Sequence, residues 1–158
     1  DRVIHALCCR SKGATIENPR QHAPHYYSRR FGPLPPCFAR ARLLDGDREK
    51  LLLVGGTASV RGEDTVHVGD LTAQLAETFD NLAVITHRAY RVDQPLDSYR
   101  ALRAYYVRDH DLPRIKAAVL DRFPRLRCVQ FVQANLCRAD LLIEIEGLAA
   151  HSIARRGR

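Results

Sequence analysis

Apolar residues follow strand-like and helix-like patterns in turn along the chain. The strand-like patterns cover residues 37–44, 50–58, 99–108, 128–136 and 141–148. Spacings of three and four predict one helix that starts near Leu71 and a second that starts near Pro113 and ends at Pro124. Together these elements give the order β-β-α-β-α-β-β. This order indicates an α+β fold in which both helices cover one face of a mixed β-sheet.

The junction between the strand at 50–58 and the first helix is rich in glycine and hydroxyl residues. Gly55 and Gly56 predict a tight loop whose backbone takes positive φ and approaches a ligand closely. Asp70 is suited to cap the N-terminus of the helix. Tight packing of the strand against the helix would explain the glycines, but not the polar groups beside them. The junction is therefore a candidate wall of a small-molecule site.

The predicted sheet has a second face without a helix. Because a large apolar face exposed to water promotes aggregation, we expect this face to pack in a trimer-like assembly or against a missing half of the protein. The chain divides into a lead-in loop at 1–36, an α+β domain at 37–150 and a basic tail at 151–158. A short apolar stretch at 1–9 is a further candidate strand. The start at Asp1 suggests a fragment whose N-terminal half is absent.

Composition narrows the functional classes. A chain of 158 residues fits one domain, without a long apolar run or a signal-type segment, so we expect a soluble cytoplasmic protein with no membrane partner. Five cysteines without a CxxC pair indicate reduced thiols rather than disulfides or a zinc site, and no cofactor is indicated. The net charge of +7 suits an anionic partner. The dispersed arginines favour a small carboxylate over nucleic acid.

Candidate chemistry gathers near the last strand and in the lead-in. Glu144 and Glu146 lie on one face of the last strand, since side chains alternate. They either point to solvent or lie in a closed face, where burial and mutual repulsion would raise one pKa and make a general acid. Cys137, beside an arginine, is either a structural thiol or part of the same site. Arg20 could clamp a carboxylate bidentately, with Tyr26 donating a second hydrogen bond.

Several segments, in order, resemble the C-terminal half of the chorismatase family, whose members split chorismate and release pyruvate. The resemblance rests on ENPRQ at 17–21 with a tyrosine six residues after its arginine, FGPLPPCFARA at 31–41, VGGTASVRGEDTVHVGD at 54–70, YYVR at 105–108 and ANLCRADLLIEIEG at 134–147. It implies the fold of the reactive-intermediate deaminases, a chorismate-mutase-like trimeric architecture with clefts between subunits. Chorismatases resemble a fused and decorated version of it.

The resemblance also implies which residues would bind the substrate, chorismate. Arg20 and Tyr26 would hold one carboxylate, and Arg108, at the end of its strand, would hold the other. Gly55 and its neighbours would line the ring pocket. Chorismate carries two carboxylates, so two arginines match what its binding requires.

Two further residues take chemical roles from the resemblance. Glu144 would protonate the methylene carbon of the enolpyruvyl group. A cysteine at the position of Cys137 accompanies family members that form 3-hydroxybenzoate. Within the family, the chain is most similar to the bifunctional members of xanthomonad bacteria, which implies 4-hydroxybenzoate as a second product.

Other interpretations compete with this one. A free-standing imine or enamine deaminase of the same superfamily is complete at about this length, but lacks the ENPRQ and FGPLPPCFARA segments. A non-enzymatic regulatory or RNA-binding domain is compatible with the positive charge and would need a contiguous basic surface. The chain could also fold and yet be inactive, because the cleft requires the absent half.

Overall fold

The computed structural model describes residues 12–153, which form a six-stranded sheet, a small hairpin and two α-helices. The sheet strands are β1 (Ala14–Ile16), β2 (Ala41–Asp45), β3 (Glu49–Ala58), β6 (Tyr99–Tyr106), β7 (Cys128–Gln133) and β8 (Ile143–Ser152). The hairpin consists of β4 (Val60–Arg61) and β5 (Asp64–Thr65). The helices are α1 (Leu71–Tyr90) and α2 (Leu112–Arg122), with 3-10 turns η1 (Pro24–Tyr26), η2 (Arg29–Phe31), η3 (Pro95–Ser98) and η4 (Asp109–Asp111).

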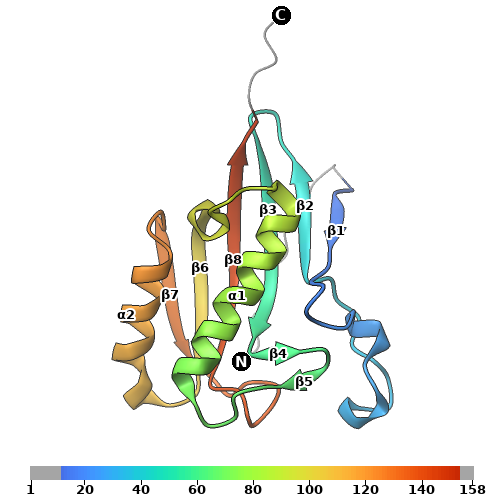
Figure 1. The fold of residues 1–158 in the computed structure, drawn as a ribbon, viewed down its shortest axis with the longest axis vertical. Coiled ribbons are helices and arrows are strands. Elements are labelled where there is room, and N and C mark those ends of the chain that lie inside the picture. Colours follow the sequence, from blue (N-terminus) through green and yellow to red (C-terminus); the bar gives the residue numbers. More distant parts are fainter. Residues whose placement is uncertain (1–11, 154–158) are drawn as a thin grey trace, which may run out of the picture.

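The strand order is β1-β2-β3-β8-β6-β7, so the last strand lies inside the sheet. Neighbouring strands are antiparallel except for β6 and β7, which are parallel. Figure 1 shows α1 and α2 over the same face of the sheet, with α1 crossing β3 and β8. The predicted α+β fold, a mixed sheet with both helices on one face, is confirmed.

Helix α1 begins and ends at residues that cap it. The Asp70 carboxylate accepts a hydrogen bond from the Ala73 N–H at 3.1 Å, which satisfies one of the free N–H groups of the first turn. At the other end, Arg91 takes a left-handed φ of 58° and donates its N–H to the carbonyl of His87. The predicted start at Leu71 is confirmed. The apolar stripe packed in the core comprises Leu71, Leu75, Phe79, Leu82 and Ile85.

Gly55 and Gly56 lie within β3 rather than in a loop. The pairing of β3 with β8 shifts register between Val54 and Thr57, so the glycines form an irregularity of the β-bulge type. Neither glycine has positive φ. The predicted loop and its backbone conformation are therefore wrong, and what the position requires is the absence of a side chain, as shown below for Gly56.

Strand boundaries also differ from the predicted ones. The predicted strand at 37–44 begins only at Ala41, because the chain bends at Arg40. Strand β6 ends two residues before Arg108, and β7 ends at Gln133, short of the predicted 136. The last strand starts and ends later than predicted, as Ile143–Ser152. The alternation of side chains shows the middle of a strand better than its ends.

The lead-in adds a strand to the sheet. Strand β1 pairs antiparallel with β2, and the 3-10 turns η1 and η2 follow it, so the described part of the lead-in is not loop throughout. Strand β1 was not predicted, because three residues are too few to show a period. The candidate strand at 1–9 lies outside the described residues. The division into lead-in, domain and tail stays a prediction.

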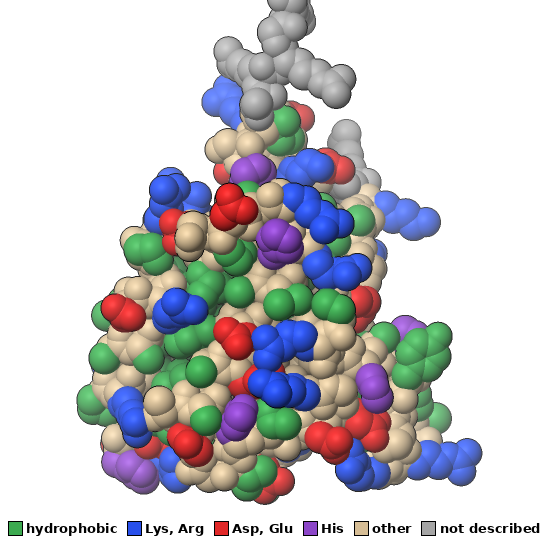
Figure 2. All heavy atoms as spheres, in the orientation of Figure 1, with side chains coloured by type: hydrophobic (Ala, Val, Ile, Leu, Met, Phe, Trp, Pro, Cys, Tyr) green, Lys and Arg blue, Asp and Glu red, His purple; other side chains and the backbone are tan. Residues whose placement is uncertain are grey.

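Charged side chains are mixed on the visible face of the molecule. Figure 2 shows Lys and Arg side chains over the whole height of the face that carries the helices, interspersed with Asp and Glu side chains. On the opposite face of the sheet, Leu51, Leu53 and Leu148 are partly exposed. A partner for that face stays a prediction. None of the helices within residues 12–153 is long and apolar enough to cross a membrane.

Candidate functional site

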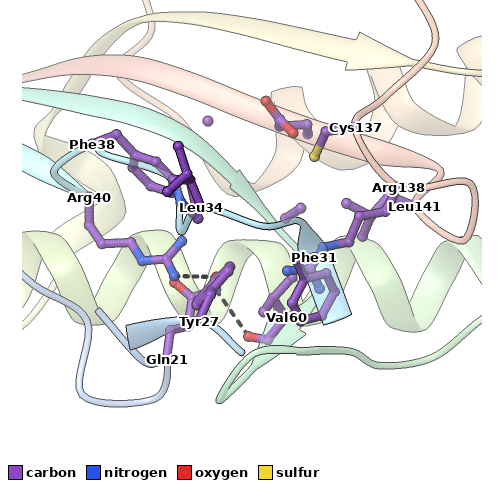
Figure 3. A pocket seen from close by; sticks show the side chains of 14 residues that line it. Gln21, Tyr27, Phe31, Leu34, Phe38, Arg40, Val60, Cys137, Arg138 and Leu141 are labelled. Carbon is purple, nitrogen blue, oxygen red and sulfur yellow. Dashed lines mark hydrogen bonds between the residues drawn. The ribbon is translucent and has the colours of Figure 1, made fainter. Parts of the chain in front are cut away.

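A pocket of about 460 Å³ opens between the lead-in, β3 and the turn that precedes β8 (Figure 3). It is lined by Gln21, Tyr27, Phe31, Leu34, Pro36, Phe38, Arg40, Gly56, Ala58, Val60, Cys137, Arg138, Leu141 and Glu144. The wall is mostly apolar and aromatic, with a few polar and charged groups, as is usual for small-molecule sites.

Glu144 and Cys137, the two residues with predicted chemical roles, line this pocket together. Glu144 lies on β8, paired with Ala58 of β3 on one side and Tyr105 of β6 on the other. Burial raises the pKa of the Glu144 carboxyl, and the charge of nearby Glu146 raises it further. A carboxyl that keeps its proton to higher pH than usual can serve as a general acid.

Glu146 has different surroundings, although it shares a face of β8 with Glu144. Its Oε1 accepts hydrogen bonds from Nη1 of Arg103 at 2.8 Å and from the Tyr105 hydroxyl at 3.1 Å. It does not line the pocket. The two carboxylates that the sequence could not separate are therefore distinguished by position: Glu144 faces the pocket, and Glu146 is paired with a cation beside it.

Cys137 presents a protonated thiol to the pocket. Burial raises the pKa of this thiol, the Glu144 carboxylate raises it further, and Arg138 acts in the opposite direction. The net shift is upward, so the group is a thiol and not a thiolate at neutral pH. Such a group fills space and donates a weak hydrogen bond, and is poorly suited to act as a nucleophile.

Gly56 leaves room for the Glu144 side chain. A Cβ atom at position 56 would overlap Oε1 of Glu144 and would lie 2.8 Å from its Cδ. At Gly55 the same atom would meet only the carbonyl oxygens of Ala39 and Arg40, at 3.5 and 3.6 Å, which is ordinary contact. Gly56, and not the predicted Gly55, therefore lines the pocket.

Two guanidinium groups lie on the pocket wall, on either side of Tyr27. Cζ of Arg40 is 5.8 Å from the centre of the Tyr27 ring, and Cζ of Arg138 is 5.6 Å from it. Figure 3 shows Tyr27 and Phe31 between the two arginines. Nη2 of Arg40 also donates to the Tyr27 hydroxyl at 2.6 Å and to the His22 carbonyl at 3.0 Å.

The β4–β5 hairpin holds two walls of the pocket in place. Nη1 of Arg138 donates to the Glu63 carbonyl at 2.8 Å and contacts the Thr65 hydroxyl at 3.3 Å. The side chain of Glu63 accepts the Ser28 N–H at 2.7 Å and pairs with Arg30 at 3.3 Å. One hairpin therefore tethers both the lead-in and the turn that carries Cys137.

Arg20 lies outside the pocket, in an ion-pair network on α1. Its Nη2 donates to Oε1 of Glu77 at 2.5 Å, and its Nη1 lies 3.3 Å from Asp80. Glu77, only 2% exposed, also accepts a hydrogen bond from Nη2 of Arg61 at 2.7 Å. This network fixes the ENPRQ segment to the helix. Within the described residues, Arg20 therefore binds carboxylates of the protein itself, those of Glu77 and Asp80.

Tyr26 and Arg108 also lie away from the pocket. Tyr26 is 75% exposed, and its neighbour Tyr27 lines the pocket instead. Arg108 follows the end of β6, and its Nε donates to Oδ2 of Asp111 at 2.6 Å. Of the residues predicted for the site, the structure thus brings together Glu144 and Cys137, and places Arg20, Tyr26 and Arg108 elsewhere.

Sequence reasoning missed Gln21, Tyr27 and Arg40 as pocket residues. The ENPRQ segment is held by buried Asn18, whose Nδ2 donates to Asn81 at 3.0 Å, and this places Gln21 at the pocket. Arg40 was expected on a half-buried strand, but it follows a non-strand segment and is 5% exposed. Its one signal is its place near the end of FGPLPPCFARA.

Within residues 12–153, no group of three or more His, Cys, Asp or Glu side chains is placed to hold a metal ion. Cys37, Cys128 and Cys137 are free thiols, and Cys8 and Cys9 lie outside the described residues.

The comparison with known proteins points to the chorismatases. A curated relative named 3-hydroxybenzoate synthase, from Streptomyces hygroscopicus, is 34% identical over 92% of this chain and 46% of its own length. A crystal structure of a chorismatase superposes with a TM-score of 0.75 and 33% identity, over 85% of this chain and 43% of its own. This chain is similar to the chorismatases. It spans less than half the length of these relatives, and no protein-family model matches it.

A more distant structural likeness identifies the fold. A protein of the conserved Rid family from Yersinia pestis has a TM-score of 0.65 at 17% identity, over 87% of this chain and 98% of its own. At that identity the likeness concerns the fold alone. The predicted reactive-intermediate-deaminase-like fold is confirmed, and its trimeric assembly stays a prediction.

Proposed function

We propose that this chain is part of a chorismatase that converts chorismate to 3-hydroxybenzoate and pyruvate. The observation that carries the proposal is the meeting of Glu144 and Cys137 in one pocket, with the pKa of the Glu144 carboxyl raised. The similarity to a 3-hydroxybenzoate synthase and to a chorismatase supports the same reaction. The guanidinium groups of Arg40 and Arg138 suit a substrate with carboxylates.

In the proposed reaction, Glu144 transfers its proton to the methylene carbon of the enolpyruvyl group. An oxocarbenium ion forms, and the neighbouring ring hydroxyl attacks it. The attacking hydroxyl loses its proton, which gives a cyclic ketal. Loss of the proton on the ring carbon that bears the ether oxygen, with cleavage of the bond between the ring and the former hydroxyl oxygen, then aromatises the ring. The hemiketal that remains collapses to pyruvate, and the phenol oxygen of the product takes up a proton, so that two protons are gained and two are lost. The atoms of chorismate equal those of the two products, so no water is consumed.

Cys137 is proposed to direct the product. Its uncharged thiol beside Glu144 leaves the ring hydroxyl, rather than a water molecule, as the attacking group. We propose 4-hydroxybenzoate as a second product, on the strength of the resemblance to the bifunctional xanthomonad enzymes.

We also propose that the site is completed by the part of the protein that this chain lacks or by a second copy. The chain covers less than half of its relatives, and the sheet face without helices is available for such a contact. Any binding of substrate carboxylate by Arg20, Tyr26 or Arg108 would belong to that completed assembly, because none of them lines the described pocket.

The test is to incubate the full protein that contains this chain with chorismate, follow pyruvate release and identify the aromatic product. We expect pyruvate in equal amount to hydroxybenzoate. Cys137→Ala is expected to shift the product toward a dihydroxycyclohexadiene acid, formed by water attack. Absence of pyruvate from the folded protein would end the chorismatase proposal and favour an imine or enamine deaminase. Unchanged product from the variant would remove Cys137 from its role.

A further inference from the structure

Arg40 is a buried cation for which the described chain supplies no counter-ion. It is 5% exposed and lines the pocket beside Tyr27 and Phe38. Its Nε is the one buried side-chain nitrogen or oxygen within residues 12–153 without a hydrogen-bond partner. Arg40 forms no ion pair in the described part of the chain. The arginines there that do pair with carboxylates are Arg20, Arg30, Arg61, Arg103, Arg108 and Arg125.

A guanidinium group stays charged when it is buried, because its pKa lies far above neutrality. Burial of a charge without a partner is costly, and so is a buried N–H without an acceptor. A ligand carboxylate would supply the missing counter-ion, because its oxygens accept from guanidinium N–H groups with well-matched geometry. Arg40 lines the pocket, so a carboxylate bound there would meet its guanidinium group.

We propose that Arg40 binds a carboxylate of the substrate through its guanidinium group. The inference names chorismate as the ligand, and in that respect it rests on the proposed function. It assigns to Arg40 a role that the sequence had given to Arg20, whose guanidinium is occupied by Glu77 and Asp80.

A purely structural role for Arg40 is the competing explanation. Nη2 holds Tyr27 and the His22 carbonyl, and Cζ lies 5.2 Å from the centre of the Phe38 ring. Those contacts fix the wall but leave Nε unused. The test therefore has to separate loss of the wall from loss of the anion contact.

The experiment compares two probes that differ by one carboxylate, 3-hydroxybenzoate and phenol, in binding titrations with the full protein. For each protein the readout is the ratio of the two affinities. In Arg40→Gln we expect this ratio to fall about ten- to a hundredfold, and in Arg40→Lys to fall less, since the charge remains. Arg42→Gln is the matched control: Arg42 is exposed, contacts Thr15 and does not line the pocket, so its ratio should match the wild type.

A structural role would weaken both probes equally and leave the ratio unchanged, and that result would overturn the proposal. So would a wild-type protein that does not prefer 3-hydroxybenzoate to phenol. If Arg40→Gln fails to fold, the wild type still decides: the NMR signal of the Arg40 Nε–H should shift with 3-hydroxybenzoate and not with phenol. An Nε–H signal that responds to neither probe would contradict the proposal.

The outcome is independent of the chorismatase assay. Pyruvate release together with an unchanged ratio in Arg40→Gln would reject Arg40 as the carboxylate ligand and leave the proposed function standing. A ratio that depends on Arg40 without any pyruvate release would reject chorismate as substrate and retain a carboxylate site at Arg40.

Discussion

The Glu144 side chain occupies the space that a side chain at Gly56 would fill. The two residues lie on neighbouring strands, β3 and β8, near the irregularity in their pairing. The glycine thus sets the position of the carboxyl that is proposed to donate the proton. It does so through close packing, since its φ is not positive.

Gly56→Ala should lower the rate of pyruvate release by about tenfold or more, because a displaced acid no longer reaches the reacting carbon. The expected change is in kcat, measured with saturating chorismate in the full protein. We expect the Glu144 side chain to move and the backbone of β3 to stay in place, because the added methyl group would clash with the end of a flexible side chain rather than with backbone.

Gly55→Ala is the matched control. Its added methyl would meet carbonyl oxygens at 3.5 and 3.6 Å, so the variant should retain activity within a factor of about two. Equal losses in the two variants would indicate a general effect on β3 and would contradict the specific relation of Gly56 to Glu144.

Glu146→Gln should move the pH profile of the reaction toward acid. Burial and the charge of Glu146 both hold the pKa of Glu144 above its ordinary value. Removal of the Glu146 charge lowers that pKa, and the Arg103 released from its ion pair lowers it further. Since the protonated acid is the active form, activity should fall at lower pH than in the wild type. An unchanged alkaline limb in kcat/KM would contradict this relation.

Glu144→Gln should abolish most pyruvate release, by about a hundredfold or more, and should also stabilise the fold at neutral pH. The raised pKa of Glu144 means that the native state loses stability as pH rises through that value. Glutamine does not ionise and so avoids this loss. Thermal unfolding should therefore show a higher Tm for the variant at about pH 8 and no difference near about pH 4. A variant less stable than the wild type at both pH values would argue against a Glu144 carboxyl whose pKa is raised in the folded state.

Glu77→Gln should destabilise the fold at neutral pH, which is the opposite of the effect expected for Glu144→Gln. Burial raises the pKa of Glu77, but hydrogen bonds and charges from Arg61 and Arg20 outweigh it, and the net pKa is lowered. The ionised form thus stabilises the fold above the unfolded pKa of about 4.3, and this stability is lost as pH falls through the lowered pKa. We expect the variant to lose about 1.5–3 kcal/mol of unfolding free energy at pH 7 and less in acid, measured by urea titration. Asp80→Asn, at an exposed partner of Arg20, is the control and should cost under about 1 kcal/mol.

The sequence predicted those parts of the fold and site that depend on neighbours along the chain. The Asp70 cap and the placing of Glu144 and Glu146 on one face of a strand follow from local rules. Cys137 was predicted because it lies in the turn just before that strand. Cys137, Glu144 and Glu146 lie within ten residues of one another in the sequence, so their proximity could be predicted without knowing how distant strands pair.

The arginine contacts could not be predicted in the same way. Arg20 meets Glu77, and Arg40 meets Tyr27, across segments whose packing no periodicity reveals. From the sequence, Arg20 was predicted as the ligand and Arg40 was not considered. Only the position of the partner carboxylate separates them, because an arginine already paired with the protein has less reason to bind a substrate anion.

The place of β8 within the sheet has a consequence for how the protein folds. Strands β3 and β6 do not pair with each other, because β8 lies between them and pairs with both. Lys50, for example, pairs with His151. As a nascent chain leaves the ribosome, β3 and β6 must wait for β8, each with an unpaired edge. Such long-range pairing predicts slow folding and a transient need for protection from aggregation.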